Sequence, residues 1–164
     1  MQKQRGRERQ RGFSLIELLI VVAIILIIAS IAIPNLLRAR MSANEASAVG
    51  GIKTINTAQI SYLSAYPTAG YAATLGALGG TACSPPNSAS ACLIDTQLAS
   101  GNKSGYNFII TGVSGTPAAA YEVVAAPAVP NKTGTRYFCS FADGVIRSSV
   151  GAIAACDGAI PPLQ

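Results

Sequence analysis

The stretch Arg11–Asn35, RGFSLIELLIVVAIILIIASIAIPN, decides the architecture of this chain of 164 residues. It contains 21 residues from Phe13 to Ile33, and Glu17 is the only charged one among them. At about 1.5 Å per residue, a helix of this length measures roughly 31 Å, close to the ~30 Å hydrocarbon thickness of a bilayer. The segment can therefore span a membrane. An acid at the centre of a spanning helix costs roughly 2.5 to 3.5 kcal/mol, so the Glu17 carboxylate needs a partner.

A cut in the chain after Gly12 would create such a partner. It would leave a new α-amino group on Phe13, one helical turn away from Glu17, and the amine and the carboxylate could neutralise each other. The junction reads as a short basic leader, then Gly12, then Phe-Ser-Leu-Ile-Glu at the start of the apolar run. This pattern resembles that of the type IV prepilin and pseudopilin family, and the resemblance continues through the expected helix to about Tyr66.

The resemblance implies how such a chain is processed and assembled. A membrane-embedded prepilin peptidase is expected to cleave between Gly12 and Phe13 and to N-methylate Phe13. Glu17 is expected to pair with the Phe13 amine of a neighbouring subunit, while an inner-membrane assembly platform builds a polymer of this chain and of minor pilins. The chain would start as a single-pass protein of the inner membrane with its head outside the cytoplasm, and end in an extracellular pilus or a periplasmic pseudopilus.

The charge of the chain is concentrated in front of the apolar run. The formal net charge is +5, and residues 1–12 supply four of these charges through five cations and one acid. Positive residues beside a spanning helix stay in the cytoplasm, and only Arg38 and Arg40 follow this one closely, so the remainder is expected on the other side. Without the leader the chain is nearly neutral, and we expect no specific binding of nucleic acid.

Behind the apolar run the helix is expected to continue to Ser64, with a kink at Pro34, which lacks the N–H that an interior helix position donates. At about 100° per residue the second half of the helix is amphipathic. Its polar arc consists of Lys53, Thr54, Thr57, Ser61 and Ser64. Its apolar arc consists of Val49, Ile52, Ile55, Ile60, Tyr62 and Leu63, with Asn56 and Gln59 as polar exceptions. A helix of about 78 Å is longer than one domain can cover, so its apolar half must be buried in a membrane and then against copies of itself.

The segment after the helix predicts a head of the α+β class with a pilin-like fold. Residues 65–105 are rich in small and turn-forming residues and are expected to form loops with one or two short helices. The short apolar pieces are Tyr71–Leu78 and Leu93–Ala99, with Gly79 and Gly101 as suitable C-caps and Asp95 in the first turn of the second piece.

Residues 106–150 predict a sheet of about four antiparallel strands that packs on the helix. The expected strands are Tyr106–Thr111, Tyr121–Ala126, Arg136–Phe141 and Val145–Val150, with a loop at Gly112–Gly115 and a hairpin turn at 142–144. Side chains alternate between the two faces of a strand. Two alternating sets are expected on the face toward the helix, namely Tyr106, Phe108 and Ile110, and Tyr137, Cys139 and Phe141.

Four cysteines in an exported head predict disulfides rather than metal binding. Cys83 and Cys92 are expected to close a small loop, which leaves Cys139 and Cys156 to tie the last strands to the C-terminal segment. Other pairings stay open, because four cysteines allow three connectivities. A C-terminal region bounded by a disulfide, here residues 139–156, also resembles that of many type IV pilins.

The sequence shows no catalytic constellation. It has no His, which excludes Ser/His/Asp and Cys/His constellations, and it has neither a Cys-x-x-Cys spacing nor a Gly-rich phosphate loop. Its acids are scattered. Asp143 and Asp157 alone make a thin case for the calcium site that the family resemblance implies for major pseudopilins. We expect no enzyme activity, no cofactor and no metal site.

Three functions remain open at this point. The first is a subunit of a type IV pilus for adhesion, twitching motility or DNA uptake, and the second is a pseudopilin of the type II secretion system. Both imply a cleaved leader 1–12, an apolar helix half 13–34, an amphipathic half 35–64 and a head 65–164. The third, of another class, is a membrane-tethered binding domain that never polymerises and keeps its N-terminus intact.

Overall fold

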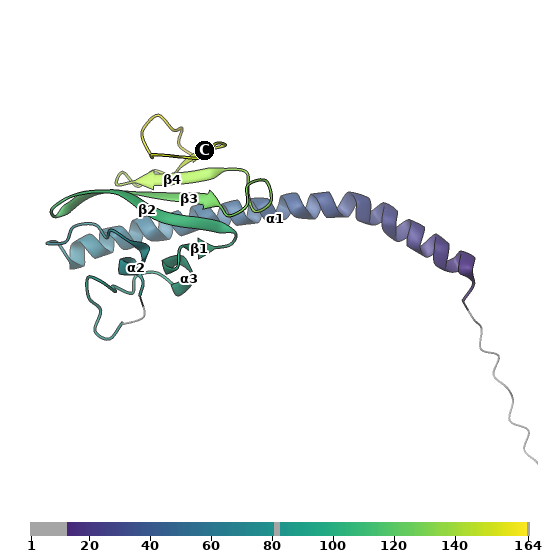
Figure 1. Cartoon of the computed structure of the whole chain (residues 1–164), viewed down its shortest axis with the longest axis horizontal. Helices are drawn as coiled ribbons and strands as arrows, with labels where there is room; N and C mark the ends of the chain where they lie inside the picture. The colour runs from purple at the N-terminus through teal and green to yellow at the C-terminus, as the bar shows by residue number, and fades with distance from the viewer. Residues whose placement is uncertain (1–12, 81–82, 164) are drawn as a thin grey trace, which may run out of the picture. The chain divides into compact units, whose positions relative to one another are not determined.

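The computed structural model describes residues 13–80 and 83–163 (Figure 1). The expected leader, and with it Gly12, lies outside the described residues. The chain divides into two compact units, Met1–Arg38 and Ala39–Gln164. One helix, α1 (Leu15–Ala65), contributes residues to both units, and its ends agree with the expected helix to within two residues.

Helix α1 contains three residues that weaken helices, and each lies inside the continuous helix. Pro34 is one of them, and the kink expected there stays a prediction. Gly50 and Gly51 are the others. A Cβ atom on Gly51 would lie 2.8 Å from Cζ of Phe108, so the absence of a side chain lets the helix approach the sheet closely. The glycine that lowers helix propensity therefore serves the packing of the head.

The head contains one sheet of five strands, in which each strand is antiparallel to the next. The strands are β1 (Asn102–Lys103), β2 (Tyr106–Gly115), β3 (Ala118–Pro127), β4 (Tyr137–Phe141) and β5 (Arg147–Ser149). The α+β class is confirmed, with one strand more than expected. Strands β4 and β5 form the expected hairpin, with Gly144 at a φ of +72° in the turn.

The expectation of a loop at Gly112–Gly115 is wrong, because β2 continues to Gly115 and pairs there with Ala118 of β3. The register shifts between Thr111 and Ser114 and again at Gly115. Gly112 and Gly115 have φ angles of +63° and +96°, which only glycine adopts without strain. These glycines let the strand bulge and continue, where the sequence pattern suggested that it ends.

The core of the head lies between the second half of α1 and one face of the sheet. From the helix it includes Ile52, Ile55 and Tyr62. From the sheet it includes the expected set Tyr106, Phe108 and Ile110, together with Tyr121, Val123 and Phe138. This confirms that the amphipathic half of the helix packs on the sheet.

The expectation that Tyr137, Cys139 and Phe141 face the helix is wrong. Phe108 pairs with Ala125 and Ala125 pairs with Phe138, so Phe138 shares the face of Phe108. Cys139 therefore lies on the opposite face, in a second cluster with Val124 and Cys156 against which Phe141 packs. Because side chains alternate, the pairing register decides the face, and the sequence pattern of one strand does not contain that register.

The expected apolar arc of α1 also needs one correction. Ile60 is 63% exposed, although it was placed on the buried side. Asn56 and Gln59, the polar exceptions, are buried instead. Their side chains find hydrogen-bond partners in the head, as described below, and this removes the usual penalty for burying an amide.

In its described residues, the segment between α1 and the sheet contains two helices of one turn each. These are α2 (Leu75–Leu78), with Gly79 as its C-cap, and α3 (Thr96–Ala99). Asp95 is the N-cap of α3, where its carboxylate accepts a hydrogen bond of 2.9 Å from the Leu98 N–H. Gly101 follows the C-cap of α3 with a φ of +81°. Gly79 is a C-cap as expected, Ser100 and not Gly101 is the C-cap of α3, and both helices are shorter than the apolar pieces that contain them.

Candidate functional site

The first half of α1 presents a continuous apolar surface. Every large hydrophobic side chain from Phe13 to Leu37 is at least 44% exposed. The helix is long and apolar enough to cross a membrane, and none of its most apolar stretch is buried inside the chain. Soluble monomers rarely expose apolar patches of this size. This surface therefore requires a lipid or protein partner.

Glu17 lies in the first turn of α1 and is exposed among these apolar side chains. The positive end of the helix dipole favours a carboxylate at this position. Phe13 is 80% exposed and lies one helical turn before Glu17. Within residues 13–80 and 83–163, Glu17 forms no ion pair. The cation that neutralises it must come from elsewhere, and the cleaved Phe13 amine of another subunit stays the predicted source.

A second acid of the same helix, Glu45, is buried and fully engaged. Its Oε1 accepts hydrogen bonds from the Thr135 N–H at 2.9 Å, the Thr135 hydroxyl at 3.0 Å and the Arg136 N–H at 3.2 Å. Its Oε2 accepts from Nε of Arg136 at 2.8 Å. Burial raises the pKa of Glu45, but these hydrogen bonds outweigh it and hold the pKa below its ordinary value. Sequence analysis missed this contact, because an isolated acid carries no signal of its partner.

The buried amides of α1 connect the helix to the rest of the head. Asn56 Nδ2 donates to the Ser140 hydroxyl at 2.9 Å, and the Tyr121 hydroxyl donates to Asn56 Oδ1 at 3.1 Å. Burial raises the pKa of Tyr121 to about 12, so its hydroxyl stays protonated and remains a donor. Gln59 exchanges two hydrogen bonds with the backbone of Ala72, at 2.8 and 2.9 Å. These groups specify how the helix sits on the sheet and offer no reactive group.

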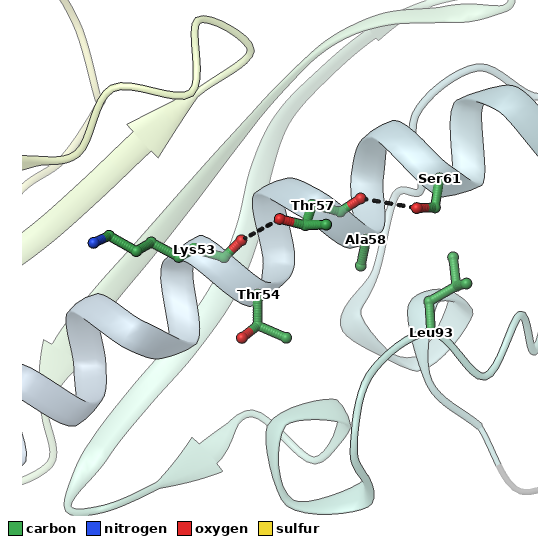
Figure 2. Close-up of a pocket in the computed structure, with 6 residues that line it drawn as sticks. All are labelled: Lys53, Thr54, Thr57, Ala58, Ser61 and Leu93. Atoms are coloured by element: carbon green, nitrogen blue, oxygen red, sulfur yellow. Dashed lines mark hydrogen bonds between the residues drawn. The ribbon is translucent and has the colours of Figure 1, made fainter.

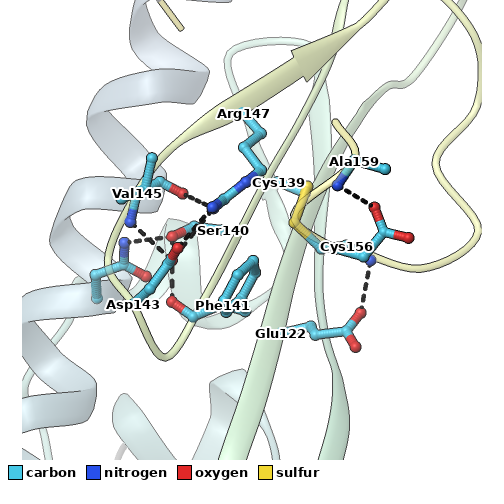
Figure 3. The surroundings of a disulfide bond; sticks show 11 residues. Glu122, Cys139, Ser140, Phe141, Asp143, Val145, Arg147, Cys156 and Ala159 are labelled. Carbon is cyan, nitrogen blue, oxygen red and sulfur yellow. Dashed lines mark hydrogen bonds and ion pairs between the residues drawn. A yellow bond between two sulfur atoms is a disulfide. The ribbon is translucent and has the colours of Figure 1, made fainter. Parts of the chain in front are cut away.

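The four cysteines form two disulfides, Cys83–Cys92 and Cys139–Cys156, with Cα–Cα distances of 5.7 and 5.9 Å. This is one of the three connectivities that the sequence allows, and it joins the pairs that the sequence favoured. Figure 3 shows the second disulfide, which links β4 to the C-terminal segment beside Glu122. The Glu122 carboxylate accepts a hydrogen bond of 2.9 Å from the Cys156 N–H.

The acids of the C-terminal region are engaged by the chain itself. Asp143 pairs with Arg147 at 2.7 Å, and the Arg147 guanidinium lies 4.3 Å from the ring centre of Phe141 (Figure 3). Asp157 accepts a hydrogen bond of 3.0 Å from the Ala159 N–H. Within the described residues there is no group of three His, Cys, Asp or Glu side chains that could hold a metal ion. Asp143 and Asp157 are not joined in one cluster.

A hollow of about 320 Å³ lies on the polar arc of α1 (Figure 2). Its lining consists of Lys53, Thr54, Thr57, Ala58, Ser61 and Leu93. The hydroxyl groups of Thr54, Thr57 and Ser61 donate to backbone carbonyls four residues earlier, at 3.0 to 3.1 Å. The hydroxyl protons are engaged in these bonds, and Lys53 is the only titratable residue of the lining. The hollow therefore offers no acid–base pair.

Comparison with known proteins finds a family match in the N-terminal segment. The family model of the prokaryotic N-terminal methylation motif matches residues 7–33. Helix α1 begins within this match, and the resemblance drawn from Gly12 to Glu17 is confirmed for the N-terminal motif.

Three known proteins are similar to part of the chain. The chain is 47% identical to the type IV major pilin protein PilA of Myxococcus xanthus over 64 residues, which are 39% of this chain and 29% of that protein. It is 66% identical to the type IV wide pilus major component PilA4 of Thermus thermophilus over 35 residues, or 21% and 27% of the two chains. It is 37% identical to the type II secretion system core protein G of Escherichia coli over 54 residues, or 33% and 37%. The chain thus spans between 27% and 37% of these relatives' length, and no solved structure matches it.

Proposed function

We propose that this chain is a pilin, a structural subunit that loses residues 1–12 and polymerises into a type IV pilus. The observation that carries the proposal is the uncovered apolar half of α1 with one acid, Glu17, near its start. A membrane covers this surface before assembly, and the same surface of other copies covers it afterwards. The similarity to two major pilus components supports the pilus over other polymers.

The assembly steps follow from the chemistry of the junction. Prepilin peptidase cuts between Gly12 and Phe13 and methylates the new amine, which stays a cation. An entering subunit carries an unpaired Glu17, whose charge is unfavourable in lipid. Pairing with the Phe13 amine of a neighbour removes that penalty and sets the axial position of the new copy. The assembly platform and minor pilins are the expected partners in the membrane, and the role is structural and not catalytic.

A pseudopilin of the type II secretion system is the second candidate, because the chain is also similar to core protein G of Escherichia coli. The calcium site that the family resemblance implies for major pseudopilins would need free carboxylates. Asp143 already pairs with Arg147, and this argues against the pseudopilin. The head of a pseudopilus remains in the periplasm, whereas a pilus carries it out of the cell. Location of the polymer therefore separates the two functions.

The deciding experiment is electron microscopy of sheared surface filaments, combined with mass spectrometry of the N-terminus. We expect filaments that contain this chain and begin with N-methylated Phe13. The pseudopilin would be favoured if the parent strain has no surface filament and deletion of this chain abolishes protein secretion. An intact Met1 with no methylated Phe13 would favour the tethered, non-polymerising domain and overturn both polymer readings.

A further inference from the structure

The loop between β3 and β4 exposes an apolar residue close to a cation. Val129 is 46% exposed, and Lys132 is also exposed. Backbone hydrogen bonds shape this loop, because the N–H groups of Lys132 and Thr133 both donate to the Val129 carbonyl, at 3.1 and 2.9 Å. A shaped loop that presents apolar and basic side chains together has the chemistry of a surface that binds at the interface of an anionic membrane.

This loop is attached to α1 shortly after the apolar run. Asn44 Nδ2 donates to the Thr133 carbonyl at 2.9 Å, and Glu45 accepts hydrogen bonds from Thr135 and Arg136 of the same loop. Apolar side chains of α1 continue to Leu37. At about 1.5 Å per residue, Arg40 lies about 5 Å and Asn44 about 10 Å further along the helix, the depth at which lipid headgroups lie beside a spanning helix.

The charge at this end of the head is positive. Neither Arg40 nor Lys132 forms an ion pair with any residue that the structure describes. Glu45 cannot serve them, because it is buried and its oxygens are taken by Thr135 and Arg136. Two exposed cations without a partner are thus available to phosphate groups at headgroup depth.

We propose that, before assembly, the loop Val129–Lys132 and Arg40 dock on anionic phospholipid headgroups of the membrane that α1 spans. The inference rests on the proposed function in one respect, namely that the apolar helix crosses a membrane. Lys132 and Arg40 contact the phosphates, and Val129 enters the headgroup layer. Docking limits the orientations of the head on the bilayer, and the contact is lost when the subunit is extracted into a polymer.

The test compares two lysines of the full-length chain in nanodiscs of phosphatidylcholine, with and without phosphatidylglycerol. A water-soluble reagent acetylates the amines, and mass spectrometry measures the rate at each lysine. Lys132 should react about fivefold more slowly when phosphatidylglycerol is present, the factor expected for one cation at an anionic surface. Lys53 is exposed on α1 about 24 Å beyond Leu37 and should react equally in both discs.

Matched variants separate docking from other causes. Arg40→Glu should abolish most of the protection of Lys132, and Lys53→Glu should leave it unchanged. Equal rates at Lys132 in both lipids would overturn the proposal. Protection that is independent of lipid charge and grows with the number of copies per disc would assign the surface to a second copy. Release of the chain from the discs by alkaline carbonate would show that α1 does not span the membrane, which refutes the proposed function. Retention of the chain with equal Lys132 acetylation rates in both lipids refutes only the docking.

Discussion

At the scale of single residues, two acids of α1 are in opposite situations. Glu17 is exposed among apolar side chains and has no cation partner in the described part of the chain. Glu45 is buried and receives four hydrogen bonds from Thr135 and Arg136. A buried charge that is already paired stabilises its own fold, and a charge without a partner is available to another molecule. We therefore assign Glu17 to assembly and Glu45 to the stability of the head.

Replacing Glu17 by Ala should impair assembly without impairing cleavage, because the peptidase acts at the Gly12–Phe13 bond and the ion pair forms later. We expect processed subunit at the normal level and filament yield reduced by more than about tenfold. In the parent, pairing in the filament relieves the roughly 2.5 to 3.5 kcal/mol that an unpaired charge costs in the bilayer, and the variant loses this driving force. Immunoblots of membranes and of sheared filaments measure both quantities. Normal filaments from this variant would remove the assigned role of Glu17.

Gly12→Val should block processing, because a branched side chain at the cut position obstructs the peptidase. The unprocessed precursor should accumulate in the membrane, and N-methylated Phe13 should be missing from its mass spectrum. Gln10→Ala, a change two residues earlier in the leader, is the matched control and should be processed normally. Efficient cleavage of the Gly12 variant would contradict the predicted junction.

Acid should weaken the head through Glu45. The folded-state pKa lies below the ordinary value of 4.5, so this stabilisation is complete above about pH 4.5 and is lost as the pH falls through the lowered pKa. Glu45→Gln should lower the free energy of unfolding at pH 7 by about 1 to 3 kcal/mol and flatten its decrease in acid. Denaturant unfolding in detergent measures this. Asp157→Asn, at an exposed acid, should keep the parent slope, and a Glu45→Gln variant with that same slope would refute the assignment.

At the scale of elements, the contact between α1 and the sheet depends on one glycine and two polar side chains of the helix. Gly51 admits the ring of Phe108, and the buried amides of Asn56 and Gln59 bind Ser140, Tyr121 and Ala72. Amphipathic periodicity alone predicted the packing stripe, but it misplaced Ile60. The position of a residue on a helix does not reveal where the partner surface ends or which polar atoms it offers.

Neighbouring glycines provide a sharp test of this contact. Gly51→Ala should lower the free energy of unfolding by about 1 to 3 kcal/mol, because its Cβ would lie 2.8 Å from the Phe108 ring in a packed core. Gly50→Ala meets no atom within 4 Å and should raise it by about 0.5 to 1 kcal/mol. Denaturant unfolding of both variants in detergent gives the comparison. Equal effects of the same sign would mean that helix propensity and not packing governs this contact.

At the scale of the whole molecule, the apolar surface and the folded core belong to different units. The exposed apolar side chains from Phe13 to Leu37 all lie in Met1–Arg38, and the core clusters lie in Ala39–Gln164. The first unit therefore depends on surroundings that other molecules supply, and the second contains its own core. This division suits a subunit that passes from lipid to a polymer with its head unchanged.

A chain that begins at Ala39 should consequently be soluble and folded without detergent. We expect a monomer in size-exclusion chromatography and cooperative thermal unfolding, because both disulfides and the core remain. The full-length chain should require detergent and form larger species when it is withdrawn. An aggregated or unfolded head would show that α1 residues before Ala39 are needed for folding.

Local patterns in the sequence were sufficient for most elements and for the N-terminal apolar segment, but they missed β1 and the extension of β2. A long apolar run, one acid and the Gly12–Phe13 junction are contiguous features, so they predict the N-terminal methylation motif without any tertiary contact. The helix ends, the strand pairs of the last hairpin and the Asp95 cap likewise depend on neighbouring residues.

Only the tertiary structure decided which surfaces meet in the head. The register of β4 turned Phe138 and not Cys139 toward the helix, and the glycines of β2 extended a strand through an expected loop. Glu45 found Arg136 at a separation of 91 residues. Such pairings are set by the free energy of packing distant segments together, and no local propensity contains that information. The sequence by itself therefore determined the exposed apolar segment of α1 with its one acid, and the tertiary structure determined what the head presents to its surroundings.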